Sequence, residues 1–412
     1  MHSLEQAYKN VSLTRFLEIL RGGNACWMIK RLSGNDTGIT GGHQSGLYIP
    51  RKFMQDFLPE IVTHTLYNPT KEIDCYIPSH DCLKKAIQAK YYNNVYFPER
   101  GNKKAYNEFR LTRWIGTPIQ EHSNTGSICI LANIRQGQTT HFLSWVSRSL
   151  EDEDLIEYWL GQDVEPGRAY FSKDEEAKIS FPYTIPSEWY RQFPTGQDIV
   201  NYVEQNVPYS TWKKSSDELL LKRRIVEFDI FSELERQEIL PLIQKGFKTV
   251  DEFIKYSTTI VNRRKSRSGM SLELHLRCIF LHEQLRFETQ MITEQKKRPD
   301  FLFPSQKAYR DPLFPTLRLH MLAAKTCCKD RWRQVLNEAD RIQQKHLFTL
   351  QEGISSEQLT EMYHHNVIVV VPQPLMRSYP KEFHRRLINL SQFVNHIKES
   401  QQTCTHYDNY GR

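Results

Sequence analysis

Three side chains in the last third of the chain have the types needed to cleave a phosphodiester. Asp300 begins an apolar stretch at Phe301–Phe303, Lys325 ends a second apolar stretch, and Glu338 follows further along. Hard cations such as Mg²⁺ prefer carboxylate oxygens, water and phosphate oxygens, so Asp300 and Glu338 are candidate metal ligands. Lys325 would orient the attacking water or offset charge developing on the phosphate.

The local patterns place these side chains at the ends of regular elements. Apolar residues alternate from Leu317 up to Lys325, which predicts a half-buried strand with the lysine at its end. After Asp330 the apolar spacing becomes that of a helix, which predicts an α-helix carrying Glu338 beside its apolar face. Two acids and a lysine spread over about forty residues are more often ordinary surface charges, so spacing alone leaves that alternative open.

Basic clusters lie close to these acids. The first, Arg263, Arg264, Lys265 and Arg267, precedes a helix expected to begin near Ser271. Cations beside the exposed amides of a helix start would bind phosphate.

Glu273 would fall in the first turn of that helix, either as a plain capping carboxylate or as an accessory acid of the metal site. Lys296, Lys297 and Arg298 directly precede Pro299 and Asp300. A further helix is expected over Glu218–Ile230, where Arg223 and Arg224 belong either to a charged outer face or to a DNA contact.

The segment from Pro299 to Glu338 resembles the catalytic domain of the EcoRII family of Type II restriction endonucleases, a variant of the PD-(D/E)xK nucleases. In that variant the second acid lies on the helix after the lysine strand, as Glu338 does relative to Lys325. Further stretches share the resemblance, which covers nearly the whole chain: Arg263–Arg267, Ser271–Leu276, Lys329–Arg333, His346–Gly353, Asn35–Gly38 and Gly41–Pro50.

The resemblance implies a restriction-endonuclease-like α/β fold, with a central mixed sheet flanked by helices, and a Mg²⁺ cofactor. It also implies that Lys329, Asp330 and Arg331 read the outer C·G pairs of CCWGG, where W is A or T. Without the family, such a tripeptide is usually a solvated helix start. Tyr309 stands where the family has a tyrosine close to the catalytic site, which implies a supporting polar role.

The first half of the chain reads as β-rich, and the family's effector domain there is a DNA-binding pseudobarrel. Gly, Asn and Asp turn signals separate the candidate strands, which are Cys26–Leu32, Ser45–Ile49, Ser127–Ile134, His141–Val146 and Arg168–Phe171. The run Lys103–Trp114 interleaves cations with aromatics, which suits DNA contacts or an amphipathic edge strand.

The family's effector-binding residues correspond to five residues here: His43, Tyr48, Lys104, Glu108 and Arg110. Tyr106 and Phe109 stand where the family has basic residues, which predicts weaker or remodelled effector contacts.

Length, charge and composition set the domain organisation. A chain of 412 residues exceeds one comfortable core, and we expect an effector domain at 1–190, a linker at 191–216, a catalytic domain at 217–402 and a disordered tail at 403–412. Residues from Thr211 onward carry a net charge of +9 and those before it −2, so a polyanion would be attracted mainly to the second half.

Neither a signal peptide nor a membrane-spanning apolar run is visible, and the eight cysteines lack framework spacing, which favours reduced cysteines in the cytoplasm of a prokaryote.

The leading hypothesis is a Type II, IIE-like restriction endonuclease. The resemblance implies two or more copies of the site on double-stranded DNA, a homodimer matching the palindrome, a cognate cytosine methyltransferase as functional partner, and an amino-terminal domain that blocks the catalytic cleft until it binds a second site. Two alternatives stay open: a non-catalytic sequence-specific DNA-binding regulator, and a repair nuclease of the same fold with little base specificity.

Overall fold

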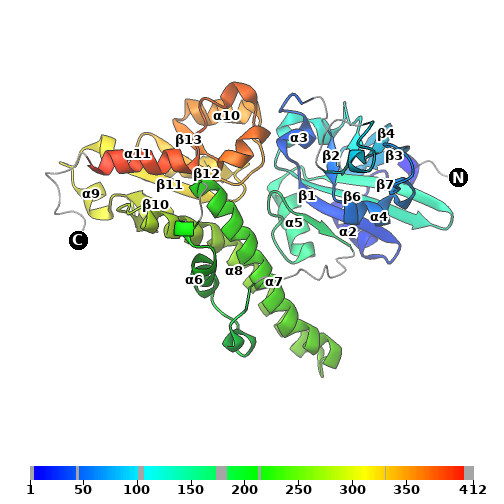
Figure 1. Ribbon diagram of the computed structural model, residues 1–412, viewed down its shortest axis with the longest axis horizontal. Helices are drawn as coiled ribbons and strands as arrows, with labels where there is room; N and C mark the ends of the chain where they lie inside the picture. The colour runs from blue at the N-terminus through cyan, green and yellow to red at the C-terminus, as the bar shows by residue number, and fades with distance from the viewer. Residues whose placement is uncertain are drawn as a thin grey trace.

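The computed structural model describes residues 4–42, 46–100, 106–172, 183–211, 215–329 and 331–402. Figure 1 shows two bodies, a β-rich amino-terminal one and an α/β carboxyl-terminal one, with a long helical hairpin extending from the second. This confirms the expected pair of domains, one β-rich and one α/β. Two groups of expected residues, His43 and Ser45 in one and Lys103 and Lys104 in the other, lie outside the described ranges.

The amino-terminal domain is built on one eight-stranded sheet in the order β2-β5-β4-β3-β7-β6-β1-β8. Neighbouring strands are antiparallel except for the parallel pair β3 and β7. The strands are β1 Ala25–Arg31, β2 Leu47–Ile49, β3 Thr70–Ile77, β4 Cys82–Tyr92, β5 Glu108–Thr112, β6 Ile128–Gln136, β7 Thr139–Val146 and β8 Ala169–Phe171. Five of them coincide with expected strands to within three residues at each end, whereas β3 and β4 were not foreseen.

The sheet curls around a short helix. Helix α4, Arg51–Phe57, places Phe53, Met54 and Phe57 in one core cluster with residues of both edge regions, including Leu47 of β2 and Phe171 of β8. Opposite ends of the sheet therefore bury apolar side chains against the same helix. The other helices of this domain are α1 Leu4–Tyr8, α2 Leu13–Arg21, α3 Gly34–Thr37 and α5 Leu150–Leu160.

The carboxyl-terminal domain has a five-stranded mixed sheet in the order β13-β12-β11-β10-β9. Strands β9 to β11 pair antiparallel, and β11 to β13 pair parallel. The strands are β9 Glu288–Thr289, β10 Phe301–Phe303, β11 His320–Lys325, β12 Lys345–Thr349 and β13 Val367–Val370. The expected strand ending at Lys325 exists, but Leu317 lies before it in a 3₁₀ turn and is 92% exposed.

Helices cover both faces of this sheet. Leu302, Met321 and Leu347 pack on one face and Phe301, Leu322 and Phe348 on the other, as alternating strand residues must. The second face is covered by parts of α7, α8 and α11. The helices are α6 Gly196–Asn206, α7 Ser216–Lys245, α8 Val250–His282, α9 Gln306–Arg310, α10 Ser356–His364 and α11 Leu390–Gln402.

Two sequence-based expectations about helices are wrong. No helix begins near Ser271, because α8 runs unbroken from Val250 to His282 and contains Arg263–Arg267 in its middle. These arginines therefore have no free helix-start amides beside them, and Glu273 is not in a first turn. The helix expected after Asp330 is a 3₁₀ helix, η10, which ends at Asn337, so Glu338 lies one residue beyond it. A 3₁₀ helix is tighter than an α-helix and occurs mostly in short pieces and connectors, as here between β11 and β12.

Candidate active site

Asp300 and Lys325 meet at one end of the paired strands β10 and β11. Asp300 Oδ2 accepts hydrogen bonds from the Ala324 amide at 2.8 Å and from Lys325 Nζ at 3.1 Å. Asp300 is buried, whereas the Lys325 side chain keeps 27% of its surface exposed. The antiparallel pairing of Phe301 with Leu322 forces this meeting, because it sets the residue before β10 beside the end of β11.

Glu338 joins this pair from the segment that follows η10. Burial first, and the charge of Asp300 second, raise the pKa of Glu338 to about 7, against the opposing effect of Lys325, Lys345 and Lys297. Its Oε2 atom is buried and has no hydrogen-bond partner. A buried carboxylate oxygen without a donor is costly, and it marks a place where a cation would be stabilising.

Glu273 also reaches this cluster, through a residue that the sequence did not single out. Gln290 donates from Nε2 to Glu273 Oε2 and to Asp300 Oδ1, both at 3.1 Å. Burial and the charge of Asp300 raise the pKa of Glu273, and the Gln290 hydrogen bond opposes them. A lone glutamine just after a two-residue strand carries no motif, so no sequence signal would have found Gln290.

Tyr309 supports the site from outside it. Its hydroxyl donates to both oxygens of Glu294, at 2.6 and 2.7 Å, and accepts from the Arg341 amide at 3.2 Å. Lys345, which the sequence analysis also passed over, donates to the backbone carbonyls of Glu338 and Ala339. Tyr309 and Lys345 thus hold the backbone at Glu338, Ala339 and Arg341, on either side of Asp340.

The donor set fits a hard divalent cation. Within the described ranges, no three His, Cys, Asp or Glu side chains form a closed metal cage. A Mg²⁺ site needs only one or two carboxylates because water and substrate phosphate complete its shell. The unpartnered Glu338 oxygen and the mutual electrostatic strain of Asp300, Glu338 and Glu273 agree with such an open site.

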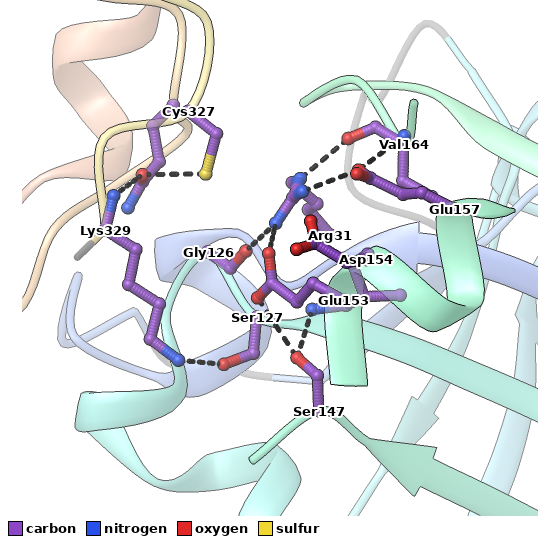
Figure 2. A network of polar contacts seen from close by, with 12 residues as sticks. Arg31, Gly126, Ser127, Ser147, Glu153, Asp154, Glu157, Val164, Cys327 and Lys329 are labelled. Carbon is purple, nitrogen blue, oxygen red and sulfur yellow. Dashed lines mark hydrogen bonds and ion pairs between the residues drawn. The ribbon is translucent and has the colours of Figure 1, made fainter. Parts of the chain in front are cut away.

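Two of the three residues expected to read bases contact the amino-terminal domain. Figure 2 shows Lys329 reaching across from the carboxyl-terminal domain to Ser127, where its Nζ donates to the hydroxyl. Arg331 Nη2 lies 3.8 Å from Asp154 Oδ1 on α5, an exposed ion pair. Asp330 lies outside the part of the chain that the structure describes.

The segment Gly126–Ser127, whose serine accepts the hydrogen bond from Lys329, is held in place by Arg31 of β1. Arg31 donates to the Gly126 and Val164 carbonyls and to the carboxylates of Glu153 and Glu157, at 2.6 to 2.9 Å (Figure 2). It is buried, so its charge is fully matched by these acceptors. The Ser127 hydroxyl is thereby presented from a rigid support.

Arg224 and Arg267, expected to contact DNA, are paired with one carboxylate of the other domain. Glu165 Oε2 accepts from Arg224 at 3.1 Å and Glu165 Oε1 from Arg267 at 2.6 Å. Burial would raise the pKa of Glu165, but Arg224, Arg267 and Arg168 outweigh it and hold that pKa below its usual range.

The other arginines in this group face inward or along their own hairpin. Arg223 is fully buried and donates to the Val207 carbonyl at 3.0 Å. Arg263 pairs with Glu238 and Arg264 with Glu235, both across α7 and α8. Lys265 is exposed.

The described residues that were expected to bind effector DNA gather where β2 meets β5. Tyr48 is 46% exposed and lies opposite Arg110 in the register, and Arg110 donates to Glu108 at 3.3 Å. Phe109 is buried and stacks on Tyr91 with ring centroids 3.9 Å apart. Tyr106 is 59% exposed, so of the two departures from the family pattern only this one is available at the surface.

Backbone contacts between the domains are unusually close at two glycines. Gly34, the first residue of α3, donates from its amide to the Glu352 carbonyl at 2.6 Å. A Cβ at Gly34 would lie 1.9 Å from the Ser378 carbonyl oxygen, and one at Gly353, where φ is +113°, would lie 2.6 Å from the same atom. Only glycine fits at this contact.

None of the described helices combines the length and apolar character that crossing a membrane requires. Among the described residues, the cysteine side chains at seven positions form no disulfide with one another.

Comparisons with known proteins agree on both halves of the chain. A family model described as "EcoRII C terminal" matches residues 231–394, and one described as "Restriction endonuclease EcoRII, N-terminal" matches residues 22–176. The "Type II restriction enzyme EcoRII" of Escherichia coli is 43% identical over 380 residues, which cover 89% of this chain and 92% of that protein.

Among solved structures, the chain resembles "Metal-depleted Ecl18kI in complex with uncleaved, modified DNA" and the same protein with uncleaved DNA. For each the TM-score is 0.42 and the identity 18%, over 52% of this chain and 82% of the other.

Proposed function

Because the chain belongs to the EcoRII family of Type II restriction endonucleases, we propose that it cuts both DNA strands at CCWGG in a Mg²⁺-dependent reaction gated by its amino-terminal domain. The family membership establishes a site-specific deoxyribonuclease. The recognition sequence, the metal and the gating are the proposal. The observation that carries it is the convergence of Asp300, Lys325 and Glu338, with a buried Glu338 oxygen that has no partner.

Each acid and the lysine has a distinct task in this reaction. Asp300 and Glu338 would hold Mg²⁺, with Glu273 as an accessory acid, and the ion would supply an activated water and neutralise charge on the phosphate. Lys325 is held by Asp300 with part of its side chain exposed, so its ammonium would be able to stabilise negative charge developing on a bound phosphate. Gln290 donates a hydrogen bond to each of Asp300 and Glu273, which reduces the electrostatic repulsion between these two carboxylates.

Base recognition is proposed for Lys329, Asp330 and Arg331. Lys and Arg donate to guanine O6 and N7, and Asp accepts from cytosine N4, which suits the outer C·G pairs of the site. Lys329 and Arg331 lie a few residues after Lys325, so one continuous segment would carry both the proposed base contacts and the catalytic lysine.

The contacts between the domains support gating by occlusion. Four side chains proposed to touch DNA are engaged by the amino-terminal domain: Lys329 with Ser127, Arg331 with Asp154, and Arg224 and Arg267 with Glu165. DNA would have to replace these partners. Binding of a second DNA copy to Tyr48, Arg110 and their neighbours would favour release, which is a coupling between two DNA sites.

The same proposal names the partners. A palindrome presents the same bases to two subunits, so a homodimer with one active site per strand matches it. A cognate cytosine methyltransferase would protect the host DNA, and both proteins would act in the cytoplasm of a prokaryote.

Plasmid digestion in Mg²⁺ tests the proposal. The purified chain is expected to give discrete fragments whose ends map to CCWGG, and Asp300→Asn is expected to lose at least about 10³-fold in cleavage while still shifting the same duplex in Ca²⁺. Smearing without discrete fragments would point to a nuclease with little base specificity. Binding without any cutting would point to a regulator, and either result would overturn the proposal.

A further inference from the structure

A buried glutamine, Gln351, lies beside the segment that is proposed to read bases. It follows β12 by two residues and is 1% exposed. In the parallel pair of β11 and β12, Lys325 lies opposite Thr349, so Gln351 comes to lie beside the residues that follow Lys325. Those residues lead directly to Lys329 and Arg331.

One oxygen of the Gln351 side chain accepts the backbone donors of this segment. Gln351 Oε1 accepts from the Cys328 amide at 3.0 Å and from the Lys329 amide at 3.1 Å. The Cys327 thiol, a weaker donor, lies 3.2 Å from the same oxygen. Because two consecutive amides are directed at one acceptor, the direction of the backbone from Cys328 to Lys329 is fixed.

The side chain replaces an acceptor that the sheet does not supply. Strand β11 ends at Lys325 and β12 at Thr349, so the amides of Cys328 and Lys329 lie beyond the ladder of hydrogen bonds between the two strands. A backbone amide that leaves water without finding an acceptor is costly. Gln351 therefore decides which backbone arrangement of this segment is stable.

Gln351 is itself held on all sides. Its Nε2 donates to the Gly353 carbonyl at 2.8 Å, and its backbone amide donates to Thr349 Oγ1 at 3.2 Å. Its backbone carbonyl accepts from the Tyr379 hydroxyl at 2.7 Å. Every polar group of Gln351 thus has a partner in the carboxyl-terminal domain, and the buried side chain presents nothing to DNA.

The amino-terminal domain lies directly over this side chain. A Cβ at Gly126, where φ is +90°, would lie 2.6 Å from Gln351 Nε2. The next residue, Ser127, accepts the hydrogen bond from Lys329 (Figure 2). The segment is therefore already built in the closed arrangement, and a preformed segment lowers the entropy cost of binding DNA.

The start of η10 extends from the same anchor. The Cys328 carbonyl accepts from the amides of Arg331 and Trp332, both at 3.1 Å. Cys328 is thus held through its amide by Gln351 and through its carbonyl by the first turn of η10. Hydrogen bonds to base edges weaken steeply with distance and angle, so the side chains that make them need a fixed backbone.

We infer that Gln351 is the positioning residue of the base-reading segment and that the preference for the outer C·G pairs depends on it. This inference rests on the proposed function, because Lys329 and Arg331 are proposed to make those base contacts.

Cleavage of cognate and altered duplexes by the full chain tests the inference. The measured quantity is the ratio of single-turnover cleavage rates at CCWGG and at a site whose outer C·G pairs are replaced by T·A. Each duplex carries the same unaltered CCWGG copy elsewhere, so that gating is equal. Gln351→Leu keeps the size of the side chain and removes its acceptor, and it is expected to lower this ratio about 10-fold or more.

A second variant keeps the test decisive if the leucine variant does not fold. Gln351→Asn retains the amide but shortens its reach by one methylene, so it cannot accept from both backbone amides. It is expected to lower the ratio in the same way.

Tyr379→Phe is the matched control for stability. It removes the hydroxyl that donates to the Gln351 carbonyl and leaves the Gln351 side chain in place. It is expected to lower the melting temperature and to keep the wild-type ratio. A ratio lost equally in Tyr379→Phe would overturn the inference, because the loss would then follow stability rather than the Gln351 side chain.

The rates on the two duplexes separate this inference from the proposed function. If the Gln351 variants slow both cleavages by the same factor, or keep the wild-type ratio, the inference fails and the proposed function stands. A wild type that cuts both duplexes equally would overturn the proposed base recognition, and this inference with it.

Discussion

At the scale of single residues, the site brings together carboxylates that repel one another. Asp300, Glu338 and Glu273 share a small volume, and the neighbouring cations and the Gln290 amide offset only part of their repulsion. The charged form of Glu338 is strongly disfavoured because the carboxyl group is buried and its Oε2 atom accepts no hydrogen bond. A site of this kind is poised to gain stability when a divalent cation binds.

Glu338 is expected to make the stability of the metal-free protein depend on pH. Its pKa of about 7 lies above the value of an unfolded glutamate, so folding disfavours its charged form and stability falls as pH rises from about 4.5 to about 7. Glu338→Gln is therefore expected to stabilise the protein by on the order of 1 kcal/mol more at pH 8 than at pH 5, after discounting for solvent screening. Urea unfolding in EDTA measures this difference, with Glu151→Gln as the exposed control. A difference that does not change with pH would contradict the role given to Glu338.

At the scale of elements, α3 joins the two regions proposed to bind DNA. Its Asp36 accepts from Lys30 of β1 at 2.7 Å and from the Tyr48 amide of β2 at 3.3 Å, while its first residue, Gly34, touches Gly353 of the other domain. Thr37 at its end bonds to Thr125, two residues before the Ser127 that holds Lys329. A shift of this helix would therefore move both the strands proposed to bind effector DNA and the segment proposed to read bases.

Gly34→Ala is expected to weaken the closed arrangement. The new Cβ would clash with the Ser378 carbonyl oxygen, so the domains must separate locally. Cleavage of DNA that carries a single site is expected to rise about 10-fold, within the usual range of allosteric coupling. Gly23→Ala, where a Cβ meets nothing within 4 Å, is the control. An unchanged single-site rate in a folded Gly34→Ala protein would show that this contact does not hold the closed state.

At the scale of the whole molecule, Glu165 is a buried polar link between the domains. It is buried and binds Arg224 and Arg267 of the hairpin, while Arg168 beside it lies over the Phe228 ring at 3.4 Å. Removing one partner of a buried ion pair leaves the other charges uncompensated. The closed arrangement thus depends on one carboxylate that also occupies two arginines proposed for DNA.

Glu165→Gln is expected to open the molecule and expose these arginines. The loss of a buried pair costs about 3–5 kcal/mol, so domain contact should weaken and the affinity for cognate DNA in Ca²⁺ should rise at least about 10-fold. Small-angle scattering and gel shifts measure the two effects, with Glu72→Gln as a control at an exposed carboxylate of the amino-terminal domain. Equal affinity of the variant and the wild type would contradict occlusion by this carboxylate.

The sequence by itself determined the family and the pairing of a β-rich domain with an α/β domain, and it proposed the central acids and lysine. Alternation and local spacing depend on neighbours along the chain, so five strands of the first domain and β11 of the second were foreseen. Local spacing failed where packing overrode it: the expected helix start at Ser271 lies inside α8, and Glu338 follows a 3₁₀ helix.

Only the tertiary structure decided which side chains meet. Gln290 reaches Asp300 because β9 and β10 pair, Phe109 turns inward to stack on Tyr91, and Lys329 and Arg224 face partners of the other domain. These contacts join residues far apart in the chain, and no local pattern encodes them. The physical reason is that ion pairing and burial depend on distances between atoms in space. These distances are set only when the two domains have folded and packed against each other.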